Sequence, residues 1–158
     1  MADVFDRKKR SDVMSRIRGK GNRTTEQSLA AGFRQAGIKG WRRHVRIRLA
    51  QVPARGGGSE THKVLIARPD FLFRRERLAV FADGCFWHGC ERHQTVPATN
   101  RPFWKAKLAR NVERDRLTDR GMKKAGWRVV RIWEHELTLG SRRSAVSRVQ
   151  RLLRREPM

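Results

Sequence analysis

The sequence predicts a small α/β domain in which helices pack against one central mixed β-sheet. Three observations support this fold class. The chain has 158 residues, the length of one ordinary domain. Apolar residues recur at helical spacing in three segments, and short runs rich in β-branched and aromatic residues between them predict strands. Hydrophobic residues make up 38% of the chain, which is enough for one modest core.

The N-terminal third predicts an arm, a helix and an extended segment. Residues 1–22 are basic, and we expect a short helix or an arm that becomes ordered on a partner. A helix then begins near Thr24 and ends near Gly37, because three apolar side chains share one face: Leu29, Ala30 and Phe33. The segment Trp41–Ile47 can be extended. We predict a flexible loop over residues 50–66, which contain a proline and three successive glycines.

The remaining elements alternate between strand and helix. A long helix begins near Pro102, a residue that the first turn of a helix tolerates, and ends near Gly126. A last amphipathic helix begins at Ser141 or Ser144. Residues 84–100 predict a compact irregular segment. Short apolar runs predict strands at Val64–Ile66, Phe71–Phe73, Leu78–Ala82 and Trp127–Trp133.

The charge of the chain predicts a polyanionic partner. Lysine and arginine number 38 and aspartate and glutamate 15, which gives a net charge of +23. Arginine outnumbers lysine, and its planar guanidinium suits phosphate and base-edge contacts. A basic surface can also serve solubility alone, but nucleic acid is the favoured partner. No apolar stretch approaches the ~20 residues of a membrane span, and no apolar signal segment follows the N-terminus, so we expect no membrane and a cytoplasmic location.

Cysteine and histidine cluster in one short segment. Cys85 and Cys90 are the two cysteines of the chain, and His88 and His93 lie beside them. His135 lies after the last predicted strand and can supply a distant ligand. Tetrahedral zinc takes four such thiolate or imidazole donors, so a metal site is favoured over a disulfide. One histidine is then left for other chemistry.

Three acidic residues are candidates for a second metal site. Asp70 begins one strand and Asp83 ends the next, so adjacent strands can direct both carboxylates at one hard cation. Such an ion polarises a phosphodiester and activates water. Glu26, near the start of the first helix, is a third candidate. The alternative interpretations are a turn-capping aspartate and a glutamate favoured in the first helical turn.

Three aromatic residues are candidates for contact with bases. Phe86 and Trp87 lie between the expected zinc ligands, and Trp104 lies at the start of the long helix. Exposed aromatic rings in a basic protein can stack on bases or wedge between base pairs. Alternatively, these rings cover the zinc site. We interpret His44 and His62 as ordinary surface residues.

Several of these motifs together resemble the very short patch repair (Vsr) endonucleases. The resemblance covers nearly the whole chain. It rests on RSDVMSRIRGKGNRTTE at 10–26, RPDF at 68–71, LAVFADGCFWHGC at 78–90, FWKAKLARNVERDR at 103–116 and GWRVVRIWEHEL at 126–137. It implies a restriction-endonuclease-like fold of the PD-(D/E)XK type. It also implies Mg²⁺-dependent nicking of one strand of duplex DNA beside the T of a T:G mismatch, which arises by deamination of 5-methylcytosine.

The resemblance also assigns roles to individual residues. Asp70 is the central Mg²⁺-binding acid, Asp83 lies at the second Mg²⁺ position, Glu26 contacts metal-bound water, and His88 is the catalytic histidine. Structural zinc positions fall on Cys85, Cys90 and His135, with either His88 or His93 as the fourth ligand. We favour His93, which leaves His88 for catalysis. Phe86, Trp87 and Trp104 match the aromatic residues that intercalate beside the mismatch.

Two departures from the family pattern bear on these roles. The best-known member of the family has histidine where this chain has Asp83, and the usual superfamily lysine is replaced by Cys85. The alternatives are a restriction or defence nuclease of the same fold and a zinc-stabilised DNA-binding protein without catalysis. We expect a monomer, because nicking one strand needs one active site. We also expect the protein to associate with the bacterial nucleoid by binding DNA.

Overall fold

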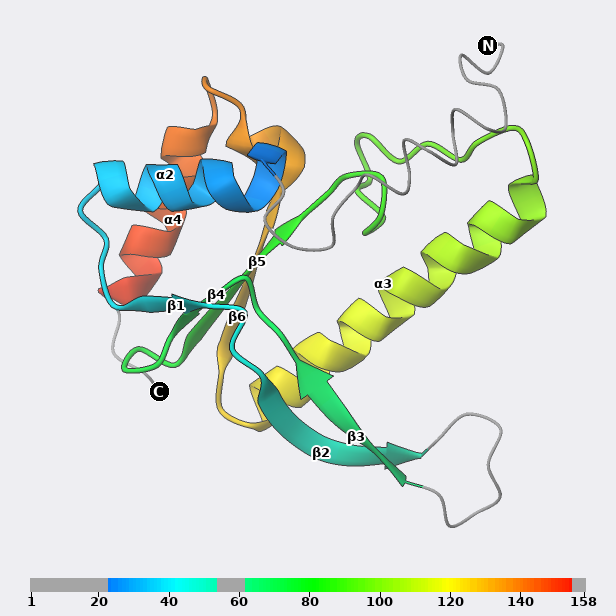
Figure 1. Cartoon of the computed structure of the whole chain (residues 1–158), viewed down its shortest axis with the longest axis horizontal. Helices are drawn as coiled ribbons and strands as arrows, with labels where there is room; N and C mark the ends of the chain where they lie inside the picture. Colours follow the sequence, from blue (N-terminus) through cyan, green and yellow to red (C-terminus); the bar gives the residue numbers. More distant parts are fainter. Residues whose placement is uncertain (1–22, 54–61, 155–158) are drawn as a thin grey trace.

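A computed structural model describes residues 23–53 and 62–154 (Figure 1). The basic arm that we expect over residues 1–22 lies outside this part of the chain. Within it the structure has the mixed α/β architecture that the sequence predicts, with one central mixed sheet and helices on both of its faces. None of the helices in the described ranges is long and apolar enough to cross a membrane.

The central sheet has four strands in the order β1-β4-β5-β6. They span Trp41–Arg43, Phe71–Phe73, Leu78–Asp83 and Arg128–Trp133. β4 is antiparallel to both β1 and β5, whereas β5 and β6 are parallel, with Asp83 opposite Trp133 at their carboxyl ends. Parallel neighbours need a crossover, and the long helix α3 (Arg101–Lys124) supplies it. The carboxyl end of β5 therefore lies beside that of β6.

Helices cover the two faces of the sheet and bury a different set of strand residues on each. Figure 1 shows α2 (Ser28–Gln35) and α4 (Arg142–Leu153) together on one side and α3 on the other. Alternate residues of β5 pack into these two cores, since neighbouring side chains of a strand point to opposite faces. Fully burying one such apolar side chain contributes about 1.5–3 kcal/mol. The first core includes Leu29, Phe33, Phe71, Val80 and Val149, and the second Leu72, Ala79, Phe81 and Met122.

The helix boundaries agree with the sequence signals. A π-helical turn, η1 (Arg23–Gln27), precedes α2, and the chain leaves α2 and α3 through Gly37 and Gly126. Both glycines have positive φ, +66° and +76°, a conformation that disfavours other residues. The segment after β5 is irregular, as expected, and a short 3₁₀ helix, η2 (Glu134–Leu137), follows β6.

The prediction of a flexible loop over residues 50–66 is wrong for most of that range, whereas the strand predicted at Val64–Ile66 is confirmed. Strands β2 (Ile47–Pro53) and β3 (His62–Ala67) form an antiparallel two-stranded sheet, and only residues 54–61 between them lie outside the described ranges. Leu49 and Leu65 pack against Gly121 of α3, where an added Cβ would lie 3.0 Å from each side chain. Apolar contact with α3 stabilises a segment whose proline and glycines indicate a loop when the sequence is considered alone.

Candidate active site and metal centre

Asp70 lies at the centre of a group of ionisable side chains. It immediately precedes β4, and one of its carboxylate oxygens accepts a hydrogen bond from the backbone N–H of Ala82 at 2.7 Å. Burial raises the pKa of Asp70 from 3.8 to about 7. The negative charges of Glu26 and Asp83 add to this rise, whereas the Ala82 N–H and His88 oppose it. The positive groups of the protein around Asp70 therefore do not offset the cost of burying its negative charge.

Asp83 ends β5 and is 3% exposed. Arg131 of β6 donates a hydrogen bond from Nη1 to Asp83 Oδ2 at 2.7 Å, and Nδ1 of His88 lies 3.7 Å from Oδ1. Burial raises the pKa of Asp83, and the charges of Arg131 and His88 oppose the rise. Asp83 therefore lies between one permanent cation and one titratable group.

His88 is held by an acid of the long helix. Its Nδ1 lies 2.7 Å from Oδ2 of Asp115, which is a hydrogen bond. Burial lowers the pKa of His88, but the hydrogen bond to Asp115 and the charges of Asp83 and Asp115 outweigh this effect and raise it overall. Sequence reasoning missed Asp115. It lies within the NVERDR motif that carried the resemblance, and that motif was its available signal.

The irregular segment after β5 lies close enough to α3 for His88 to reach Asp115. Gly89 has φ +72°, and a Cβ added there would lie 2.7 Å from a methyl carbon of Val112. The residue before Val112, Asn111, donates from its side-chain amide to the carbonyl of Trp87 at 3.3 Å. A larger residue at position 89 would move this segment away from α3 and separate His88 from Asp115.

Arg131 connects β6 to the acids of α3. Its guanidinium donates from Nε and Nη2 to the carboxylate of Asp119 at 2.9–3.2 Å, while Nη1 contacts Asp83. Burial alone lowers the pKa of Arg131, but the hydrogen bonds and charges of these acids raise it overall, so the group stays charged. Sequence reasoning missed this residue too, because a single arginine on a strand carries no distinguishing signal.

Glu26 is a further acid close to Asp70. It is 4% exposed, and its Oε2 contacts Nη2 of Arg43 and lies 3.0 Å from Nε2 of His44. One ligand atom from each of Glu26, His44 and Asp70 lies within 4.8 Å of the others. The interpretation of His44 as an ordinary surface residue is wrong, because its ring is turned toward two acids. The side chain of His62 lies outside the described part of the structure.

A second cluster contains the residues expected to bind zinc. One ligand atom from each of Cys85, Cys90, His93 and His135 lies within 4.8 Å of the others. Nδ1 of His135 lies 3.2 Å from Sγ of Cys85 and 3.5 Å from Sγ of Cys90. Sγ of Cys90 lies 3.6 Å from Nδ1 of His93. Neighbouring sulfur and nitrogen ligands of a tetrahedral zinc are separated by about 3.6 Å, so these donors have the spacing of a zinc site.

The free state of both cysteines agrees with a metal site rather than a disulfide. Cys85 and Cys90 are buried and unbonded to each other. Burial raises the pKa of Cys85, and the neighbouring Cys90 raises it further, although the backbone of His135 opposes the rise. Because their charges would repel, two such adjacent thiols would ionise together only with a cation between them. Of the two histidines considered as fourth ligand, His93 lies with the cysteines and His88 lies with the acids.

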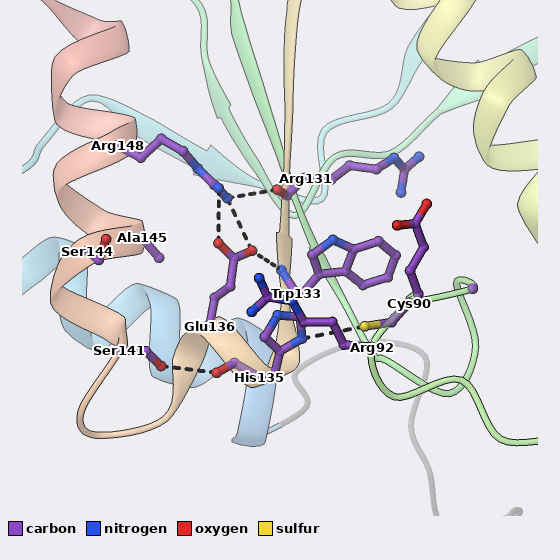
Figure 2. A pocket seen from close by; sticks show the side chains of 12 residues that line it. Cys90, Arg92, Arg131, Trp133, His135, Glu136, Ser141, Ser144, Ala145 and Arg148 are labelled. Atoms are coloured by element: carbon purple, nitrogen blue, oxygen red, sulfur yellow. Dashed lines mark hydrogen bonds and ion pairs between the residues drawn. The ribbon is translucent and has the colours of Figure 1, made fainter.

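A pocket of about 680 Å³ borders this cluster (Figure 2). Cys90 and His135 lie at one side and α4 at the other. Within the pocket Glu136 forms an ion pair with Arg148 at 3.0 Å, and Arg148 also donates to the carbonyl of Arg131. Arg148 thus joins α4 to β6 and to Glu136, the neighbour of His135 in the cluster of cysteines and histidines.

The three candidate intercalating residues form one aromatic group. Ring centroids are 4.9 Å apart for Phe86 and Trp87, 5.7 Å for Phe86 and Trp104, and 6.0 Å for Trp87 and Trp104. Trp104 is buried, whereas Phe86 and Trp87 are partly exposed. Lys107 lies over the rings of Trp87 and Trp104 at 5.3 and 5.4 Å. The group joins the segment after β5 to the first turns of α3.

Comparison with known proteins identifies relatives of this chain. A family model described as DNA mismatch endonuclease Vsr matches residues 59–94. The DNA mismatch endonuclease Vsr of Escherichia coli K12 is 34% identical over 85% of this chain and 74% of its own length. The type II nicking enzyme V.NmeAIP of Neisseria meningitidis serogroup A is 30% identical over 87% of this chain and 85% of its own.

A third relative matches more strongly over a shorter region. The type II nicking enzyme V.NaeI of Lentzea aerocolonigenes is 54% identical over 44% of this chain, and the match spans 42% of that enzyme. The match with the Escherichia coli protein extends over most of both chains, and two relatives carry the description of nicking enzymes. The chain belongs to the Vsr family of DNA mismatch endonucleases, hydrolases that nick DNA.

Proposed function

We propose that this protein nicks one strand of duplex DNA beside the T of a T:G mismatch, in a reaction that depends on Mg²⁺. The observation that carries the proposal is the buried Asp70 carboxyl with two further acids and His88 in electrostatic contact. Nucleases need such a concentration of negative charge to bind a divalent cation, whereas a protein that only binds DNA gains nothing from acids that face phosphates.

The residues present fit a magnesium ion. Asp70 and Asp83 would hold it, since carboxylate oxygens are the ligands that Mg²⁺ prefers. When bound, Mg²⁺ polarises the phosphodiester and stabilises the charge that develops on it. Glu26 offers a further carboxylate close to Asp70, where it can orient water by a hydrogen bond. The chain lacks the usual superfamily lysine, and Arg131 is the permanent cation that contacts Asp83.

His88 is the group best placed to move a proton. Asp115 accepts a hydrogen bond from Nδ1–H of His88, which leaves the lone pair of Nε2 available in the neutral ring. A neutral imidazole can then take a proton from the attacking water. Because Asp115 and Asp83 favour the protonated ring, the fraction of active enzyme should rise as the pH increases through the pKa of His88.

We propose that zinc, bound by Cys85, Cys90, His93 and His135, has a structural role. Four protein ligands leave no open position for substrate, which is typical of structural zinc. The ion would fix both ends of the segment that carries Phe86, Trp87 and His88. The aromatic group and the catalytic histidine would then reach DNA without an ordering step at the moment of binding.

We propose that the aromatic group of Phe86, Trp87 and Trp104 recognises the mismatch. A T:G wobble pair changes the hydrogen-bonding edges of the grooves only modestly, but it weakens stacking. Insertion of a ring costs a few kcal/mol per base step, and less where the stack is already weak. Phe86 and Trp87 are partly exposed and supported from behind by the buried Trp104, as such a wedge requires.

The experiment that tests this function is a nicking assay on matched duplexes. A labelled T:G duplex and its T:A counterpart are incubated with zinc-loaded protein, with and without Mg²⁺. We expect nicks only in the T:G duplex, only in the strand with the mispaired T, and only with Mg²⁺. Equal nicking of the T:A duplex would instead support a restriction or defence nuclease. Mismatch binding without nicking in any metal would support the non-catalytic alternative.

A further inference from the structure

His44 is the residue near Asp70 whose presence the mechanism above does not use. It comes directly after β1, and its Nε2 lies 3.0 Å from Oε2 of Glu26. Together with Asp70 these side chains come from three separate segments, and one ligand atom of each lies within 4.8 Å of the others. Ligand atoms on one octahedral ion with bonds of about 2.1 Å are separated by about 3.0–4.2 Å. The cluster is compact enough to surround one ion after small side-chain adjustments.

The backbone brings this imidazole to the acids at a cost. His44 has φ +53°, the left-handed region that most residues other than glycine avoid. The chain turns there between β1 and β2, and the turn directs the ring back toward Glu26. A non-glycine residue in this conformation carries backbone strain that the surrounding structure has to hold in place. Residues held in this way are concentrated at functional sites.

An ion pair with Glu26 alone does not explain the position of His44. Arg43, the preceding residue, already contacts the same carboxylate oxygen of Glu26. The acid that lacks compensation is Asp70, whose carboxylate has the Ala82 N–H as its hydrogen-bond donor and which lies near Glu26, Asp83 and His88. Arg131 faces Asp83 from β6 and also pairs with Asp119. A divalent cation between Asp70, Glu26 and the Nε2 lone pair of His44 would supply the missing charge.

We propose that His44 and Glu26 bind the catalytic divalent ion directly, in addition to Asp70 and Asp83, with Glu26 a ligand itself rather than a partner of bound water, and that the site binds Mn²⁺ more tightly than Mg²⁺. This inference rests on the proposed function, because it concerns the ion of the same active site. Carboxylates together with one imidazole form a mixed oxygen and nitrogen donor set. Imidazole is a poor ligand for Mg²⁺ and a good one for first-row transition metals. The proposal therefore predicts a metal preference as well as a ligand.

The test is electron spin echo envelope modulation of zinc-loaded protein with one equivalent of Mn²⁺. We expect a nitrogen hyperfine coupling typical of a bound imidazole in the wild type and in the control variant His88→Ala. It should disappear in His44→Asn. Asparagine tolerates the left-handed conformation, so this variant keeps the turn and avoids a folding defect. Titration should show at least a tenfold loss of Mn²⁺ affinity in His44→Asn and a much smaller change for Mg²⁺.

Three results would overturn the proposal: no nitrogen coupling in the wild type, a coupling that persists in His44→Asn, or one that disappears in His88→Ala. The nicking assay separates this failure from failure of the proposed function. If the wild type nicks the T:G duplex with Mg²⁺ while these signatures are missing, the function stands and His44 is not a ligand. If the coupling is present and follows His44, but neither metal supports nicking, the ligand assignment stands and the proposed function fails.

Discussion

Replacement of Asp70 by asparagine should stabilise the Mg²⁺-free protein. The pKa of this carboxyl is raised by burial from 3.8 to about 7. Each pKa unit corresponds to about 1.4 kcal/mol, so ionisation of Asp70 costs the folded state about 4 kcal/mol above pH 7. Because the pKa is raised, the folded protein has its full stability from this group below pH 4, where Asp70 is neutral. That contribution to the free energy of unfolding is lost as the pH rises to 7. Asparagine has no charge, and its side-chain oxygen can still accept the hydrogen bond from Ala82.

The assay is thermal unfolding of zinc-loaded, Mg²⁺-free protein at pH 5 and pH 8. Local relaxation reduces the ideal value, so we expect Asp70→Asn to unfold with a free energy about 2–4 kcal/mol higher at pH 8. This corresponds to a Tm higher by roughly 5–12 °C. The difference should fall to less than half at pH 5. Added Mg²⁺ should stabilise the wild type and not the variant, because only the wild type keeps the binding carboxylate.

Two outcomes would refute this reasoning. A variant as stable as the wild type, or less stable, at pH 8 would show that Asp70 is ionised without cost in the folded protein. A gain in stability that is the same at pH 5 and pH 8 would show that the effect does not arise from ionisation. Either result would remove the electrostatic argument for a cation at Asp70.

Three further predictions concern the other parts of the site. Asp115→Asn should lower the pKa of His88, so the rising limb of the pH–rate profile should move to lower pH, while the plateau falls at least about tenfold because the ring tautomer is no longer fixed; an unmoved limb would exclude His88 as the base. Cys90→Ser should reduce the zinc content measured by elemental analysis from about one ion per chain and lower the Tm markedly, since structural zinc adds directly to folding energy; full zinc occupancy at unchanged Tm would contradict the ligand assignment. Trp87→Ala should reduce the T:G over T:A binding ratio, measured by competition at matched salt, more than it reduces overall DNA affinity; an unchanged ratio would mean that this ring only packs against its neighbours.

Local sequence signals predicted the central fold well. The strand Leu78–Ala82 and the helix that begins near Pro102 were recognisable because burial and periodicity are local properties of the chain. The segment 50–66 was not, because Pro53 and the glycines indicate a loop, while the pairing of β2 with β3 and their contact with α3 are long-range. Within this segment, Val64–Ile66 alone had a local strand signal.

The same distinction applies to the site. Cys85, Cys90, His93 and His135 were predictable as a group because thiols and imidazoles at this density have few other uses, and the structure brings their ligand atoms together. Asp115 and Arg131 were not predicted, because each takes its role from a partner 27 or 48 positions away in the chain. His44 was misjudged for the same reason, since only the turn after β1 directs it toward Glu26 and Asp70.

We propose that Asp70 holds the ion on which DNA nicking depends. The measurement that tests it most directly is the single-turnover nicking rate of a T:G duplex, for the wild type and Asp70→Asn, as the Mg²⁺ concentration is raised. We predict a rate that saturates with Mg²⁺ in the wild type and is at least about 100-fold lower at every concentration in the variant. The affinity of the variant for the T:G duplex should remain within a few-fold of the wild-type value. Nicking by Asp70→Asn at the wild-type rate, with the same Mg²⁺ dependence, would contradict the account.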